Sequence, residues 1–193
     1  FGRIPAAAKI VFLNAWLQES GDYGSVRLLR FYVAYRAVVR AKVCAIRAAQ
    51  ANQGRRARAA ALASCRSYLA LASGNLERVK PALIITHGLP GSGKTTFAQA
   101  ALERFAAIRI RSDVERKRLH DLLPLADSRS RPGTGLYGAE ATRRTYARLL
   151  ELAGDLLKAG HTVIVDAAFL HQDERAQFSR LAHGLAVPFV IAS

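Results

Sequence analysis

The residues with the clearest chemistry form a glycine-rich octet, Gly88-Leu89-Pro90-Gly91-Ser92-Gly93-Lys94-Thr95, which matches G-x-x-x-x-G-K-[ST] without a departure. Glycines let the backbone curl so that its N–H groups point inward at an anion, and the following helix adds its positive N-terminus. In such a loop Lys94 bridges the β- and γ-phosphates of a nucleotide, and the Thr95 hydroxyl ligates magnesium. Thr96 either contacts the nucleotide or packs in the first helical turn. The octet therefore predicts a site for ATP or GTP with Mg²⁺.

A first carboxylate ends a strand predicted over residues 162–166 (TVIVD). A run of β-branched residues that closes on Asp166 is typical of the second metal-binding motif of such sites. This pattern predicts that Asp166 lies near the magnesium ion or its waters. Capping of the following turn is the alternative role for this residue.

A second carboxylate, Asp113, follows a strand predicted over residues 107–110. As a general base, Asp113 would accept the proton of an acceptor hydroxyl. As a structural residue, it would be the N-cap of a helix, with Ser112 as the rival cap. Asp113 and Arg116 are three residues apart, so both can face one site from a first helical turn.

The elements around these residues alternate between strand and helix from residue 82 onward. Strands are predicted over residues 82–87, 107–110, 162–166 and 187–192, and helices over 94–105, 114–123, 139–159 and 173–183, with a Pro/Gly/Ser-rich loop at 124–135. This alternation predicts an α/β fold with a parallel sheet of about four strands flanked by helices, of the P-loop NTPase type. The expected strand order is 2-3-1-4.

Residues 5–73 are predicted to be helical throughout, with helices over 5–20, 25–51 and 56–72. The turn between the last two helices includes residues 52–54. On the second helix, Phe31, Tyr32 and Tyr35 lie on the apolar side and are expected in the core. The composition changes at Pro81, so we expect a helical segment over residues 1–78 and a phosphate-binding domain over residues 79–193.

The composition is that of a strongly basic globular protein, with 193 residues, a net charge of +15 and 51% hydrophobic residues. The charge fits a phosphate-bearing partner, nucleotide or nucleic acid, although an arginine- and alanine-rich bias would give the same excess. No stretch reaches the roughly 18 apolar residues of a membrane span. Cys44 and Cys65 are outside any metal-binding spacing, so we predict a reducing, cytoplasmic location. The chain contains no methionine, and we expect it to be trimmed or incomplete.

Three motifs carry a resemblance to a known family. GLPGSGKTT, RSDVER and VIVDAAF resemble the small P-loop kinases that include polynucleotide kinase, gluconate kinase and zeta toxin. The resemblance covers about residues 81–192, and it implies that Asp113 is the catalytic base and that Arg116 helps to hold the acceptor. Kinases of this group carry an arginine-bearing lid after the fourth strand, whereas this sequence stops at Ser193.

A closer resemblance is to bacterial two-part proteins that join an aminoglycoside-phosphotransferase-like domain to such a kinase. FYVAYRAVVRAKV in residues 31–43 and the segment 135–170 look like their counterparts there. This resemblance implies that residues 1–78 are the helical tail of the first domain.

The motifs together predict an ATP-dependent phosphotransferase that transfers the γ-phosphate of Mg-ATP to a hydroxyl. Two alternatives remain open: a nucleotide-binding module without catalysis of its own, and a polynucleotide-kinase-like enzyme that acts on nucleic acid. Binding of ATP without turnover would distinguish the non-catalytic module from the phosphotransferase. Strong, salt-dependent binding to an oligonucleotide would favour the nucleic-acid enzyme. The sequence does not specify the acceptor, the choice between ATP and GTP, or the oligomeric state.

Overall fold

The computed structural model of the chain describes residues 4–50, 54–76, 80–89, 91–123 and 138–193. The loop expected over 124–135, residues 52–53 and Pro90 lie outside the described residues. The chain divides into two compact units, Phe1–Gly24 with Val79–Ser193, and Ser25–Arg78. The first helix is therefore grouped with the α/β unit, whereas the sequence placed it in the helical segment.

The α/β unit is built on four parallel strands: β1 (Leu83–Thr86), β2 (Ile108–Arg111), β3 (Val163–Asp166) and β4 (Phe189–Ala192). Their order is β2-β3-β1-β4, which confirms the predicted order and the P-loop NTPase fold. Every residue of β1 and β3 is buried, as expected of inner strands covered on both faces. The register pairs Arg111 with Asp166, so the last residues of β2 and β3 lie side by side.

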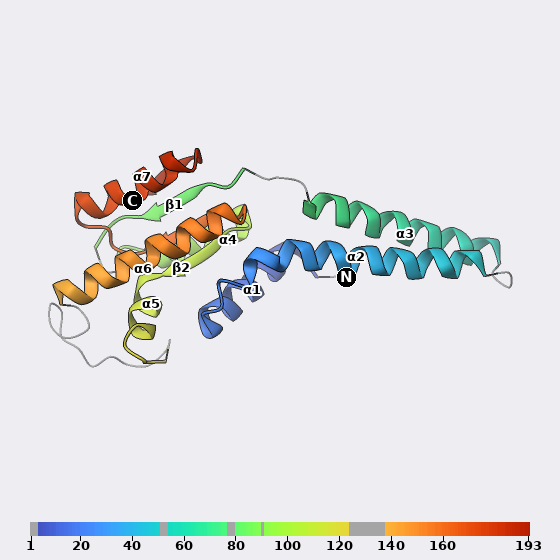
Figure 1. Cartoon of the computed structure of the whole chain (residues 1–193), viewed down its shortest axis with the longest axis horizontal. Helices are drawn as coiled ribbons and strands as arrows, with labels where there is room; N and C mark the ends of the chain where they lie inside the picture. The colour runs from blue at the N-terminus through green and yellow to red at the C-terminus, as the bar shows by residue number, and fades with distance from the viewer. Residues whose placement is uncertain (1–3, 51–53, 77–79, 90, 124–137) are drawn as a thin grey trace. The chain divides into compact units, whose positions relative to one another are not determined.

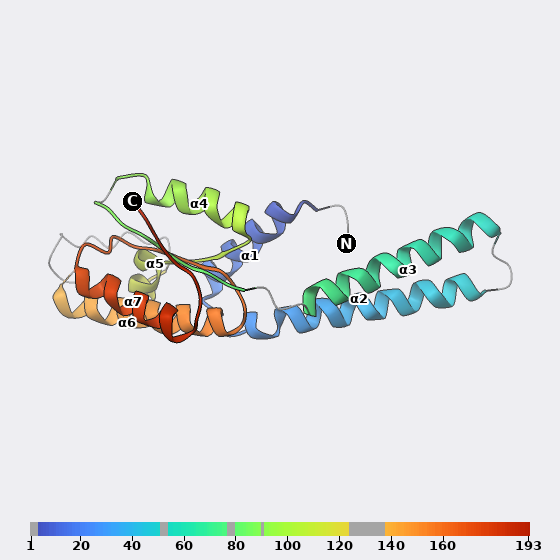
Figure 2. The same ribbon diagram turned by 90° about the horizontal axis from the view of Figure 1, so that it is seen from above.

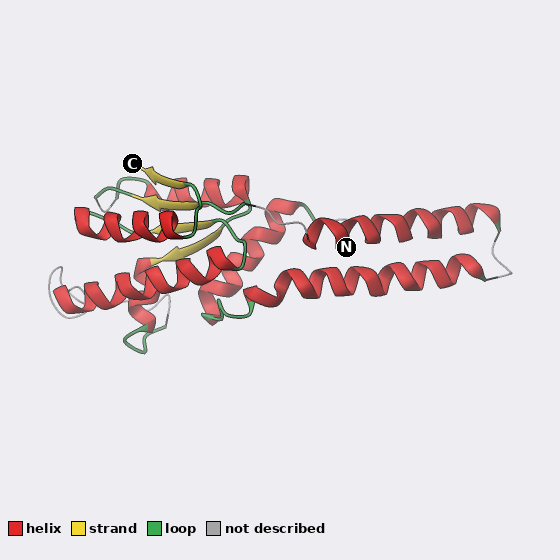
Figure 3. Cartoon of the chain, turned by 45° about the horizontal axis from the view of Figure 1, so that its top comes forward, coloured by secondary structure: helices red, strands yellow, loops and turns green. Residues whose placement is uncertain are grey.

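Helices cover both faces of this sheet (Figures 2 and 3). On one face lie α1 (Ala6–Ser20) and α4 (Lys94–Phe105), and on the other lie α6 (Ala139–Lys158) and α7 (Gln172–Gly184). The short helix α5 (Ser112–Arg118) follows β2 directly. It begins two residues before the predicted start, because the extended residue Arg111 is its N-cap. It ends at Arg118, five residues before the predicted end.

Helix α1 is attached to the sheet through Asn14, whose side chain is 6% exposed. Strand β2 is an edge strand, and its outward-facing backbone groups need partners. The Asn14 side-chain amide supplies a donor and an acceptor for this edge. Its Nδ2 donates to the Ala107 carbonyl at 3.0 Å, and its Oδ1 accepts from the Arg109 N–H at 2.7 Å. This helix thereby completes the edge of the α/β unit.

The second unit consists of two helices, α2 (Val26–Ala49) and α3 (Arg55–Leu76), that run side by side as a hairpin (Figure 1). Ala34 and Ala37 of α2 pack against Ala72 of α3. The prediction that the aromatic side of α2 is core was wrong, since Phe31, Tyr32 and Tyr35 are 55–58% exposed. Small alanine side chains let the two helices approach closely, and this alanine face forms the contact while the aromatic face does not.

No helix among the residues that the structure describes is both long enough and apolar enough to cross a membrane.

Candidate functional site

The glycine-rich loop connects β1 to α4 and adopts a backbone that requires glycine. Gly88, Gly91 and Gly93 have φ angles of +140°, +82° and +82°, which side-chain-bearing residues rarely adopt. The Lys94 ammonium donates to the Leu89 carbonyl at 2.5 Å and to Ser92 Oγ at 3.3 Å. The lysine therefore lies over the loop, within reach of an anion that the loop amides would hold.

The two predicted metal ligands are in direct contact. Asp166 is 7% exposed, and its Oδ2 accepts a hydrogen bond of 3.1 Å from the Thr95 hydroxyl. A hydroxyl and a carboxylate are the oxygen donors that Mg²⁺ prefers, and Mg²⁺ keeps waters and phosphate oxygens in its remaining positions. The residues at this point therefore fit a magnesium ion bound together with a nucleotide.

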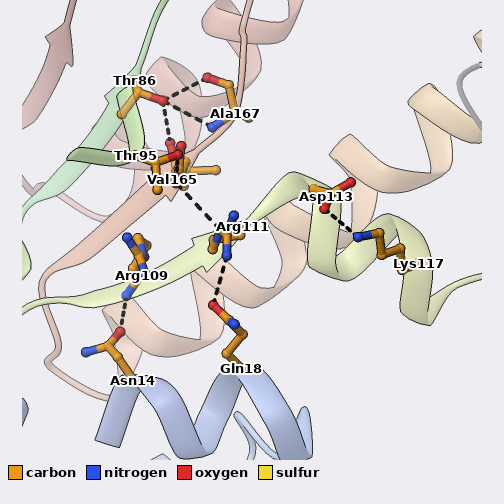
Figure 4. A network of polar contacts seen from close by, with 11 residues as sticks. Asn14, Gln18, Thr86, Thr95, Arg109, Arg111, Asp113, Lys117, Val165 and Ala167 are labelled. Carbon is orange, nitrogen blue, oxygen red and sulfur yellow. Dashed lines mark hydrogen bonds and ion pairs between the residues drawn. The ribbon is translucent and has the colours of Figure 1, made fainter. Parts of the chain in front are cut away.

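The predicted base lies on α5. The N-cap residue of this helix is Arg111, so neither Asp113 nor Ser112 occupies the capping position considered above. The Asp113 carboxylate lies 2.9 Å from the Lys117 ammonium, one turn further along the helix, and its side chain is 44% exposed (Figure 4).

One cavity of about 380 Å³ joins the residues for which the sequence predicted chemistry. It lies where the loop, the ends of β2 and β3, and the start of α5 meet, as expected for a ligand site beyond the carboxyl ends of parallel strands. Its lining residues are Gly91, Lys94, Thr95, Arg111, Ser112, Asp113, Arg116, Asp166, Ala167 and Ala168. All five predicted catalytic and metal-binding side chains therefore face one space.

Some predicted binding residues lie outside this cavity. Ser92 and Gly93 line a separate hollow of about 70 Å³, and Thr96 lines a shallow hollow beside α4 together with Thr95 and Arg109. Thr96 is exposed, so the structure does not place it in a packed position.

Sequence reasoning assigned no role to Arg111, although this residue lines the cavity and its Nε lies 3.8 Å from Asp166 Oδ2. The signal was present in the alternation of β2, where isoleucines and arginines point to opposite faces of the sheet. Arg109 precedes it on the same face. Burial and the neighbouring Arg111 charge lower the pKa of Arg109, while Asp166 acts in the opposite direction. Positive charge is thus concentrated at the end of this edge strand.

The segment after Asp166 is fixed by buried contacts. The Thr86 hydroxyl donates to the Ala167 carbonyl at 2.8 Å and accepts from the Ala167 N–H at 3.1 Å. The Phe169 N–H donates to the Tyr146 hydroxyl of α6 at 3.0 Å, and the two rings pack edge to face. Burial raises the pKa of Tyr146 to about 12, opposed by this backbone hydrogen bond. These contacts fix the backbone of the segment that directly follows Asp166.

The fold and this cavity define a P-loop domain of the kinase-like type. The chain belongs to the AAA domain family, whose model matches residues 83–192. It is 34% identical over 181 residues to uncharacterised proteins of Mycobacterium bovis (strain ATCC BAA-935 / AF2122/97) and Mycobacterium tuberculosis (strain ATCC 25618 / H37Rv). The match covers 92% of this chain and 35% of each relative, so the chain spans about a third of their length.

Proposed function

We propose that the chain is an ATP-dependent phosphotransferase of the cytoplasm that transfers the γ-phosphate of Mg-ATP to a hydroxyl group. The observation that carries the proposal is the shared cavity. The loop lysine and the Thr95–Asp166 pair line one part of it, and the Asp113 carboxylate faces the same space from a different helix. A site of this kind can align a triphosphate with an acceptor, and alignment with charge neutralisation supplies most of the rate in such transfers.

Each side chain then has a defined task. The loop amides and Lys94 bind the phosphates, while Thr95 and Asp166 would hold Mg²⁺, which neutralises charge on the transferring group. The acceptor oxygen attacks the γ-phosphorus and the bond from phosphorus to the ADP oxygen breaks, with its electron pair leaving on ADP. Asp113 accepts the proton of the acceptor hydroxyl. To reach the carboxylate, this hydroxyl would displace the Lys117 ammonium that lies beside Asp113. Arg116 would hold the acceptor.

Two variants test this assignment, with Mg-ATP as ligand and water as the acceptor. Lys94→Ala should abolish ATP binding measured by calorimetry. Asp113→Asn should bind ATP with unchanged affinity but release ADP about a hundredfold more slowly, because it can no longer take the proton. Lys158→Ala, at the exposed end of α6, removes the same charge as Lys94→Ala but away from the cavity, and should change neither quantity. Unchanged turnover in Asp113→Asn would remove this residue from the mechanism.

A nucleotide-binding module without catalysis is the second candidate function. It is favoured by the ion pair between Asp113 and Lys117, since the carboxylate is already occupied by an ammonium that an acceptor hydroxyl would have to displace. Tight binding of ATP without release of ADP, in the wild-type chain with hydroxyl compounds present, would support this candidate instead.

For the helices we propose, on the resemblance over residues 31–43, that α2 and α3 belong to the aminoglycoside-phosphotransferase-like part of a two-part protein. The length of the mycobacterial relatives is compatible with such an arrangement. Helix α1 is better assigned to the kinase-like unit, because Asn14 completes its sheet edge.

A further inference from the structure

Arg111 occupies the point of the cavity between the predicted metal ligands and the predicted base. It is the last residue of β2, it pairs with Asp166 in the sheet register, and it lies two residues before Asp113. Its side chain is 29% exposed, so it is shielded from bulk water but open to the cavity that it lines.

Three cationic side chains line the cavity, Lys94, Arg111 and Arg116, and together they favour an anion at this point. Its Nε lies 3.8 Å from Asp166 Oδ2, the same oxygen that accepts the Thr95 hydrogen bond. Arg111 is thus adjacent to the place where the metal-bound end of a triphosphate would lie. The planar guanidinium has several N–H donors, which match phosphate oxygens better than a lysine ammonium does. The 3.8 Å separation from Asp166 is longer than a hydrogen bond, so the Nε donor of Arg111 can also serve a ligand.

The guanidinium is held from the other side by α1 (Figure 4). Arg111 Nη1 donates to Gln18 Oε1 at 3.3 Å. The main-chain carbonyl of Gln18 accepts a 2.8 Å hydrogen bond from Arg118 Nη2, which ties the same turn of α1 to α5. One turn earlier, Asn14 binds the β2 backbone. Helix α1 therefore fixes Arg111 relative to both the strand and the helix that carries Asp113.

We propose that Arg111 contacts the terminal phosphate of the bound triphosphate, and that Gln18 is the residue that positions it. This inference rests on the proposed function, because it requires a nucleotide in the glycine-rich loop. Its consequence is discrimination: a guanidinium at the γ-phosphate strengthens binding of a triphosphate and leaves binding of a diphosphate nearly unchanged.

The test compares the dissociation constants of two probes, Mg-AMPPNP, a non-hydrolysable triphosphate, and Mg-ADP. In Arg111→Gln the dissociation constant of Mg-AMPPNP should rise about tenfold or more, since a charged hydrogen bond to phosphate is removed, while that of Mg-ADP should change less than about threefold. Arg109→Gln is the matched control. It removes the same charge from the same face of β2 but does not line the cavity, and should shift both constants equally.

Variants of Gln18 test the positioning role. Gln18→Ala should reduce the preference for Mg-AMPPNP in the wild-type background and have no further effect when combined with Arg111→Gln. Gln18→Glu keeps an acceptor oxygen for Arg111 and should retain the preference. Arg111→Lys keeps the charge but not the planar set of N–H donors, and should give an intermediate preference for Mg-AMPPNP over Mg-ADP.

The outcomes separate this inference from the function on which it rests. If the folded wild-type chain binds neither nucleotide, the proposed function fails. If the wild type binds both and Arg111→Gln weakens both equally or neither, the role of Arg111 is overturned while nucleotide binding stands. Additive effects of Gln18→Ala and Arg111→Gln would refute the positioning role alone. Circular dichroism of each variant establishes that it is folded.

Discussion

Asp166 is the residue at which the metal and the nucleotide would meet. Its carboxylate is nearly buried and already bound to the Thr95 hydroxyl, so its environment is set before any ligand enters. Asp166→Asn keeps the shape and can still accept the Thr95 hydrogen bond, but it removes the negative charge that a divalent cation needs. We expect the affinity for ADP measured with magnesium to fall by about tenfold or more, while the affinity without magnesium stays the same or rises.

A calorimetric titration of ADP with and without magnesium measures this difference. Asp173→Asn, in the exposed first turn of α7, removes an equal charge away from the cavity and is the control. An equal loss of affinity with and without magnesium in Asp166→Asn would mean that this carboxylate supports the loop and not the metal.

Among single residues, the sequence predicted the cavity positions that belong to a short, locally recognisable motif. Lys94 and Thr95 belong to one octet, and Asp166 ends an apolar run, so each could be recognised locally. Arg111 could not be assigned in this way, because its position beside Asp166 depends on the register between two strands more than fifty residues apart. The cap of α5 was equally undecided, since Ser112 and Asp113 have the same preference for an N-cap, and the structure selects Arg111.

Helix α6 contacts the segment that follows Asp166 through the side chain of Tyr146. The Tyr146 hydroxyl accepts a hydrogen bond from the Phe169 N–H, and the Phe169 ring packs against Tyr146 and Phe178 with centroids 5.1 and 4.9 Å away. Phe169 has a φ of +50°, so these contacts hold a backbone conformation that is unfavourable for phenylalanine.

The pH dependence of stability reports on this contact. Because burial raises the pKa of Tyr146 from 10.0 to about 12, the neutral phenol stabilises the folded state. That contribution is complete below pH 10 and is lost as the pH rises through about 12. Tyr146→Phe removes the hydrogen bond and should cost about 1 kcal/mol at neutral pH. Its deficit relative to the wild type should shrink between pH 10 and 12.

Urea unfolding of the wild type and Tyr146→Phe at a series of pH values measures this difference. Taking the difference removes the titration of the other groups that both proteins share. A deficit that stays constant up to pH 12 would mean that Tyr146 ionises as easily in the folded chain as in the unfolded one.

The elements themselves were largely predictable, because strands alternating with helices and a loop between the first strand and helix leave few possible topologies. What periodicity could not determine is which apolar face of a helix is covered. Helix α2 has an alanine face and a face with Phe31 and Tyr35, and aromatic residues are the stronger signal of burial in a sequence. Close approach to α3 selects the alanine face, and that choice depends on the partner helix.

On the scale of the whole molecule, the basic charge is unevenly divided along the chain. Residues 25–76 contain ten basic side chains and no acidic one, whereas the chain as a whole has 29 basic and 14 acidic residues. The basic residues of this segment are Arg27, Arg30, Arg36, Arg40, Lys42, Arg47, Arg55, Arg56, Arg58 and Arg66. The hairpin of α2 and α3 thus has a charge density typical of a surface that attracts polyanions.

This uneven division predicts where electrostatic binding to nucleic acid would occur. Replacing Arg36, Arg47 and Arg58, which are exposed on the hairpin, with glutamine should weaken binding to a single-stranded oligonucleotide and flatten its salt dependence. The slope of log affinity against log salt becomes shallower by about 0.7 for each phosphate that the protein no longer neutralises. Replacing Arg104, Arg143 and Arg144, exposed on α4 and α6, lowers the net charge equally and should have a smaller effect.

Fluorescence anisotropy over a range of salt concentrations measures both triple variants. The comparison decides between two interpretations of the basic composition, because binding at a localised surface weakens when the hairpin changes, whereas a general arginine bias responds to net charge alone. Equal reductions of affinity in the two variants would assign the binding to net charge, and the hairpin would then have no special part in it. A selective reduction in the hairpin variant would make the helical unit the polyanion-binding part of the chain, separate from the cavity that we assign to the nucleotide.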